Sequence, residues 1–203
     1  MRRWSSWWRA ATVLVFLGVA PPAWAVPGPE EAVVGGPAPG FSLKVLNPEA
    51  AGVSWLSLQS LAGAEPEDAE ARVVLVSFFA SWCAPCKKEL PLLVELDTRF
   101  RSLGLRVIGI SIDKEEPGIA AARKLAADHR AAYPVLSDRF NLLARRYLGD
   151  QAPLPSVFLI GRDGNILAVE RGYTKDASSF LRARVEAALG IKRTAVGPGA
   201  KAP

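Results

Sequence analysis

The chain of 203 residues contains two cysteines, and they stand three positions apart as Cys83 and Cys86 in the segment Trp82-Cys83-Ala84-Pro85-Cys86. A disulfide between them would close a very small loop, for which the entropic stabilisation of a cross-link is smallest. A purely structural role therefore explains the pair poorly. Two thiols at this spacing can attack a substrate disulfide in turn, the first forming a mixed disulfide and the second resolving it. The pattern predicts a redox-active pair that carries out thiol-disulfide exchange.

A metal site is the main alternative for the same spacing. Two thiolates could hold Cu(I) or contribute to a zinc site, but a closed zinc site needs four ligands. The sequence offers one histidine, His129, far from the cysteines along the chain, and its one methionine is Met1. We therefore expect no metal and no other cofactor, and a copper carrier is the less favoured hypothesis.

The elements on either side of the cysteines indicate how the pair is positioned. Residues 72–80 are β-branched and aromatic over a length suited to a buried strand. Residues 84–103 have the composition of a helix that ends at Gly104. Cys83 is thus expected at the helix N-terminus, where free N-H groups and the helix dipole favour a thiolate, with Cys86 one turn later.

The rest of the chain predicts an α/β domain with a mixed sheet, because strands alternate with helices and a hairpin and a final helix follow. We expect a short N-terminal hairpin, a helical turn, a solvated acidic loop, a second buried strand, two helices, a second hairpin and a C-terminal helix. These elements are assigned to residues 41–46 with 53–56, 57–61, 64–71, 105–112, 119–130 with 138–147, 156–160 with 165–169, and 176–189.

The N-terminus has the features of a signal peptide, residues 1–25. A basic start is followed by an apolar stretch over residues 10–20 and by Ala23-Trp24-Ala25, a suitable cleavage site, so the mature chain would begin at Val26. The alternative is an uncleaved anchor with tryptophans at the bilayer interface, although the apolar run is shorter than the roughly 20 residues of a spanning helix. We expect an exported protein, periplasmic where the source has two membranes, or one tethered to the outer face of the inner membrane.

The formal net charge of +5 does not indicate a nucleic-acid partner. The excess lies in the two ends of the chain, since residues 26–190 hold 19 basic and 20 acidic side chains. A domain without a basic excess has no electrostatic footprint for a polyanion.

Several segments resemble the exported thioredoxin-like proteins of the TlpA and ResA type. The resemblance covers about residues 35–190, after an extended lead-in over residues 26–34 and before a tail over residues 191–203 that is expected to be disordered. It implies a thioredoxin fold, a mixed central sheet flanked by helices, with an N-terminal hairpin and a central helical insertion. The matching segments are Val74-Leu75-Val76-Ser77-Phe78-Phe79-Ala80-Ser81-Trp82-Cys83-Ala84-Pro85-Cys86-Lys87, Gly36-Pro37-Ala38-Pro39-Gly40-Phe41, Lys87-Lys88-Glu89-Leu90-Pro91 and Pro155-Ser156-Val157-Phe158-Leu159-Ile160.

The resemblance also implies a substrate-binding surface. A cis peptide between Leu154 and Pro155 is expected to face the cysteines and to present backbone to the substrate together with Trp82. On base rates alone an X-Pro bond in a folded protein is cis in only about 5% of cases. Pro153 is a second candidate for that bond.

Glu89 is the third expected catalytic residue. Thioredoxins commonly carry a buried Asp for proton transfer at the strand position that Ser77 occupies here. Glu89 lies three residues after Cys86, on the same helix face, and could supply that carboxylate. The alternative is an exposed Glu89 paired with a nearby lysine.

The function implied by the resemblance is the reduction of disulfides in exported proteins. Apocytochrome c is an expected substrate, with electrons supplied by a membrane thiol donor and with the protein acting as a monomer. A general disulfide oxidant is the alternative. A peroxidase is disfavoured, because peroxiredoxins carry Thr and Pro where this chain has Ala80 and Val76.

Overall fold

The structure is a computed structural model that describes residues 32–173 and 177–191. The predicted signal peptide, most of the lead-in and all of the predicted tail after Ile191 lie outside these residues. Within them no helix is both long and apolar enough to cross a membrane. The elements in chain order are β1 (Ser42–Lys44), α1 (Pro48–Ala51), β2 (Trp55–Ser57), β3 (Val73–Phe79), α2 (Ala84–Phe100), the 3-10 turn η1 (Arg101–Leu103), β4 (Leu105–Ser111), α3 (Glu116–Asp128), β5 (Val135–Ser137), α4 (Leu142–Leu148), β6 (Ser156–Gly161), β7 (Ile166–Arg171) and α5 (Ala177–Ala188).

A five-stranded mixed sheet forms the centre of the domain, with the strand order β5-β4-β3-β6-β7. Strands β3, β4 and β5 run parallel, whereas β6 is antiparallel to β3 and β7 is antiparallel to β6. All seven residues of β3 are buried, as expected for a central strand covered on both faces. The carboxyl ends of the three parallel strands therefore lie together at one end of the sheet.

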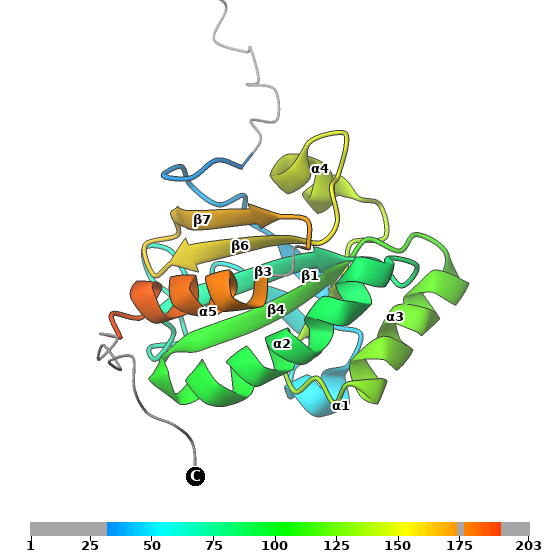
Figure 1. Ribbon diagram of the computed structural model, residues 1–203, viewed down its shortest axis with the longest axis horizontal. Helices are drawn as coiled ribbons and strands as arrows, with labels where there is room; N and C mark the ends of the chain where they lie inside the picture. Colours follow the sequence, from blue (N-terminus) through cyan, green and yellow to red (C-terminus); the bar gives the residue numbers. More distant parts are fainter. Residues whose placement is uncertain (1–31, 174–176, 192–203) are drawn as a thin grey trace, which may run out of the picture.

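Alternation along β3 assigns the helices to the two faces of the sheet. Ser77 faces α2, because its hydroxyl contacts a side chain of that helix. The neighbouring Phe78 faces the other way and packs against Tyr147 of α4 and Phe158 of β6, with ring centroids 5.1 and 5.9 Å away. Helices α2 and α5 lie side by side across the first face (Figure 1). The Ser77 side chain is thus enclosed between the sheet and α2, the helix predicted to follow Cys83.

The N-terminal hairpin predicted from the sequence is present as β1 paired with β2. It joins the main sheet at the β5 edge, where Val45 bridges to Leu136 and the Leu46 amide donates to the Val135 carbonyl at 2.7 Å. The buried side chain of Asn47 extends this junction by accepting from the Val135 amide at 2.9 Å. The hairpin is therefore fixed to the edge of the sheet rather than projecting from it.

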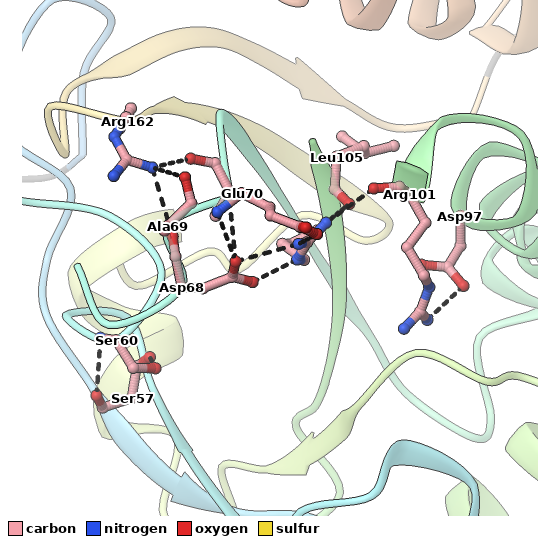
Figure 2. Close-up of polar contacts among 11 residues, drawn as sticks. Ser57, Ser60, Asp68, Ala69, Glu70, Asp97, Arg101, Leu105 and Arg162 are labelled. Carbon is pink, nitrogen blue, oxygen red and sulfur yellow. Dashed lines mark hydrogen bonds and ion pairs between the residues drawn. The ribbon is translucent and has the colours of Figure 1, made fainter. Parts of the chain in front are cut away.

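The acidic segment 64–71 is held more firmly than the expected solvated loop. Asp68 pairs with Arg106 of β4 through contacts of 2.6 and 3.1 Å, and Arg106 holds the pKa of that carboxyl below its usual value. Arg162 donates to the carbonyls of Ala69 and Ala71 from the β6–β7 turn (Figure 2). Two arginines therefore anchor this segment at the end of the sheet where β3 begins.

Other features also differ from the sequence-based expectations, and two of them lie between α3 and β6. The short strand β5 was not predicted, because three residues are too few to show a periodicity. Helix α4 begins at Leu142 rather than at residue 138, since the Asp138 carboxylate accepts from the Ala144 amide at 2.7 Å and Asn141 adopts a left-handed conformation with φ 55°. Residues 138–141 thus form a turn that precedes the helix.

Candidate active site

Cys83 and Cys86 are joined by a disulfide at the N-terminus of α2, with an S–S distance of 2.07 Å. Cys83 is the N-cap residue of this helix, and its sulfur accepts a hydrogen bond from the Cys86 amide at 3.2 Å. The residue Cys83 is 5% exposed and Cys86 is 1% exposed. Helix N-terminal amides stabilise a thiolate, so the geometry favours Cys83 as the nucleophile once the pair is reduced.

The residues expected to bind substrate lie around the same end of the sheet. Trp82 is 70% exposed. The peptide bond between Leu154 and Pro155 is cis, as predicted. β6 begins beside the end of β3, with Ser156 opposite Phe78. Pro155 therefore lies at the end of the sheet from which residues 80–83, the redox loop between β3 and α2, continue. The roles of these residues toward a substrate stay predictions.

Glu89 lies inside the protein, so the alternative of a solvent-exposed Glu89 paired with lysine is wrong. It is 4% exposed, and its Oε2 accepts a hydrogen bond from Ser77 Oγ at 2.9 Å. Burial raises the pKa of Glu89 to about 7, the Ser77 hydrogen bond opposes this rise, and the charge of Glu170 adds to it. A carboxyl group with this pKa exchanges its proton near neutral pH, as a general base requires.

The strand register explains why Glu170 acts on Glu89. Ser77 is paired with Val157 of β6, and Val157 is paired with Glu170 of β7. Directly opposed residues point to the same face of a sheet, so Glu170 lies on the face that α2 and α5 cover. This half-buried carboxylate was not found from the sequence, because its position depends on the pairing of three strands.

Asp113 is a further buried acid beside the redox loop that the sequence analysis did not identify. It lies two residues after the end of β4 and is 4% exposed. Its carboxylate accepts from the Ser81 amide at 2.9 Å, from Ser81 Oγ at 2.7 Å and from Ser111 Oγ at 2.8 Å. An aspartate two residues after a buried parallel strand is the signal that could have indicated it.

A groove of about 560 Å³ lies away from the cysteines, between the N-terminal hairpin, α3 and the turn before α4. Trp55 and Phe140 stand exposed in its wall, together with Lys44 and Arg123. Neither cysteine lines it. In the part of the chain that the structure describes, no group of three or more His, Cys, Asp or Glu side chains is arranged to hold a metal ion.

Comparison with known families and sequences gives a consistent result. The model of the AhpC/TSA family matches residues 34–169. Two curated relatives named thiol-disulfide oxidoreductase ResA come from Bacillus cereus and Bacillus subtilis. The first is 29% identical over 103 residues, covering 51% of this chain and 57% of the relative. The second is 28% identical over 108 residues, covering 53% of this chain and 58% of the relative. The matched segment thus spans less than two thirds of either relative.

Solved structures confirm the thioredoxin-like fold. A thiol:disulfide interchange protein of the thioredoxin family from Chlorobium tepidum TLS superposes with a TM-score of 0.58 at 28% identity, covering 76% of this chain and 96% of that one. A secreted disulfide oxidoreductase of Mycobacterium tuberculosis superposes with a TM-score of 0.56 at 18% identity, covering 72% and 95%. At this lower identity the second likeness concerns the fold alone.

Proposed function

The chain belongs to the AhpC/TSA family, and from this premise we propose that it is a thiol-disulfide oxidoreductase that uses the Cys83–Cys86 couple. One observation carries the proposal: the two sulfurs occupy the first turn of α2, and the buried carboxyl group of Glu89 follows Cys86 by three residues on the same helix. Nucleophile, resolving thiol and proton acceptor are thereby supplied by one rigid element.

The first step is attack by the Cys83 thiolate on a substrate disulfide. A bond forms between Cys83 Sγ and one substrate sulfur, the substrate disulfide breaks, and the second substrate sulfur leaves as a thiolate. The amide of Cys86, which contacts Cys83 Sγ at 3.2 Å, stabilises the attacking thiolate before this step. Trp82 and the backbone at Leu154 and Pro155 form the surface on which the substrate chain rests.

The second step is resolution by Cys86. Its thiol is disfavoured as a thiolate by burial, so it has to lose its proton as it attacks. Glu89 takes up this proton, and the Cys86 sulfur displaces the remaining substrate thiolate from Cys83. The enzyme is left with the Cys83–Cys86 disulfide, and the substrate has gained the two electrons of the dithiol. A membrane thiol donor then reduces the enzyme again.

The substrates are disulfide-bonded exported proteins, and apocytochrome c is the specific candidate, because haem attachment requires reduced thiols. The signal features of residues 1–25 support export, and the name of the ResA relatives supports thiol-disulfide exchange. The protein acts as an exported monomer, in the periplasm of a source with two membranes or tethered to the outer face of the inner membrane.

The reduction potential of the Cys83–Cys86 couple tests the direction of electron flow. Equilibration of the purified protein with glutathione or dithiothreitol buffers, read by trapping of free thiols, gives this value directly. A potential near the ~−270 mV of thioredoxin supports a reductant, whereas a value near the ~−120 mV of DsbA would establish the alternative, a disulfide oxidant. Failure of the reduced protein to exchange with any protein disulfide would overturn the proposal as a whole.

A further inference from the structure

We propose that Asp113 is a positioning residue for Cys83, whose carboxylate fastens the redox loop to the end of β4. The proposal rests on the function assigned above and adds to it a residue outside the C-x-x-C segment and its helix. Asp113 lies in the connection between β4 and α3, whereas the cysteines follow β3. Asp113 and Ser81 are 32 residues apart along the chain.

The contact extends the parallel pairing of β3 and β4 beyond the ends of both strands. The last pair in register is Phe79 with Ser111, and the Ile112 amide then donates to the Phe79 carbonyl at 3.0 Å. Beyond that point backbone pairing stops, and the Asp113 carboxylate takes over by accepting from both the amide and the hydroxyl of Ser81. Hydrogen bonds to the Asp113 side chain thus replace the backbone hydrogen bonds between β3 and β4 where the redox loop leaves the sheet.

The carboxylate itself is fixed in one orientation. Ser111 Oγ donates to Asp113 Oδ2 at 2.8 Å and accepts from the Asp113 amide at 3.2 Å. The start of α3 closes the other side, because a Cβ added to Gly118 would lie 2.9 Å from Asp113 Oδ1. A buried acceptor that receives several charge-assisted hydrogen bonds is well suited to hold a loop.

Ser81, the residue that Asp113 holds, lies two positions before the nucleophile Cys83. Between them the chain turns tightly, with the Cys83 amide donating to the Ala80 carbonyl at 3.1 Å. This turn places Cys83 at the N-cap, where its sulfur receives the Cys86 amide. If Ser81 is released, the turn loosens and Cys83 Sγ spends less time against that amide, so the thiolate loses part of its stabilisation.

The negative charge of Asp113 would act on the pKa of Cys83 in the opposite direction. Holding Ser81 in place lowers this pKa, whereas a nearby negative charge raises it. A nearby carboxylate disfavours a thiolate, so removing its charge alone lowers the pKa of the thiol. The exposed charged groups along the two segments are Lys87 and Lys88 on α2 and Lys114, Glu115 and Glu116 after Asp113, and solvent screens them. Glu89 on α2 is buried and titrates within the same pH range, and it is unchanged in each variant compared below. The sign of the change in the pKa of Cys83 thus separates positioning from simple electrostatics.

The test compares Asp113→Asn with the wild type in the reduced, full-length protein. The rate of Cys83 alkylation by iodoacetamide is measured from pH 4 to 10, with the modified residue identified by mass spectrometry. We expect the pKa of Cys83 to rise and its alkylation near neutral pH to slow by roughly 3- to 10-fold, equivalent to a rise of roughly 0.5 to 1 pKa unit. Asp128→Asn, which removes the same charge from the exposed end of α3, should leave the profile unchanged.

A fall in the pKa of Cys83, or an unchanged pKa with only a lower melting temperature, would overturn the proposal. Gly118→Ala is the second variant and covers the case in which Asp113→Asn does not fold. It crowds the Asp113 carboxylate without changing any charge, so it should shift the pKa of Cys83 upward as well. Alkylation needs no protein substrate, and its outcome is therefore independent of whether the chain exchanges disulfides with exported proteins.

Discussion

Ser77 Oγ donates a hydrogen bond of 2.9 Å to Glu89 Oε2, and both residues are buried between β3 and α2. The sequence places a hydroxyl at the strand position where thioredoxins carry the acid, and it places the acid on the facing helix. The pair therefore keeps a buried carboxyl group between β3 and α2 while changing the element that bears it. A single neutral donor only partly offsets the cost of burying the charge, which leaves the pKa of Glu89 near 7.

Replacement of Ser77 by Ala should raise the pKa of Glu89 further. The hydroxyl stabilises the charged form of the carboxyl group, and alanine removes that hydrogen bond without adding bulk. The acidic limb of the pH-rate profile for disulfide exchange should move to higher pH. Single-turnover rates from pH 5 to 9 provide the measurement, and a limb that stays in place or moves to lower pH would contradict the assigned role of the hydrogen bond.

Glu89→Gln should slow resolution of the mixed disulfide while preserving the fold. Glutamine has the same shape and can still accept from Ser77, but it cannot take up a proton. Loss of a general base typically costs about 10² to 10⁴-fold in rate. The matched control is Glu95→Gln, which changes an exposed carboxylate on the same helix. An unchanged pH-rate profile in the Glu89→Gln variant would refute proton transfer by Glu89.

The same substitution should change how stability depends on pH. The folded-state pKa of Glu89 is raised from 4.5 to about 7, so its protonated form stabilises the fold below pH 4.5, and this contribution is lost as the pH rises through about 7. The loss amounts to about 3 kcal/mol at roughly 1.4 kcal/mol per pKa unit. Urea unfolding of the oxidised wild type and of Glu89→Gln at pH 4.5 and pH 8.5 measures it. The variant should gain in relative stability toward pH 8.5, and parallel pH dependences would contradict the prediction.

The sequence was sufficient for features that depend on local order. The apolar run of β3, the long helix after it and the C-x-x-C segment between them are adjacent along the chain, so the position of Cys83 at the N-cap follows from their order alone. The position of Glu89 could also be predicted from the sequence, because a spacing of three residues places it on the same side of the helix as Cys86.

The residues that the sequence did not yield depend on pairing between distant segments. Asp113 reaches Ser81 only because β3 and β4 are parallel neighbours that end together. Glu170 shares a face with Ser77 only through the register of β6 and β7, and a shift of one residue would turn it to the opposite face. No local periodicity encodes either relationship.

The two cysteines should respond differently to replacement by serine. Cys83→Ser removes the nucleophile and should abolish exchange, whereas Cys86→Ser keeps the attack on substrate and should accumulate a mixed disulfide. Non-reducing gel electrophoresis after incubation with a disulfide-bonded protein detects this adduct. Faster alkylation of Cys86 than of Cys83 in the reduced wild type would reverse the assigned roles.

Glu170→Gln should shift the titration of Glu89 in the opposite direction from Ser77→Ala. Glu170 lies in the row that runs from β7 through Val157 to Ser77, and its negative charge raises the pKa of Glu89. With that charge removed, the pKa of Glu89 should fall, and the acidic limb of the exchange rate should move to lower pH. The carboxyl resonance of Glu89, followed by NMR in protein labelled with ¹³C, reports this pKa without any substrate. Glu67→Gln, an exposed change in the acidic segment 64–71, serves as the control for net charge. An unchanged or higher pKa of Glu89 in the Glu170→Gln variant would show that the charge of Glu170 does not raise the pKa of Glu89.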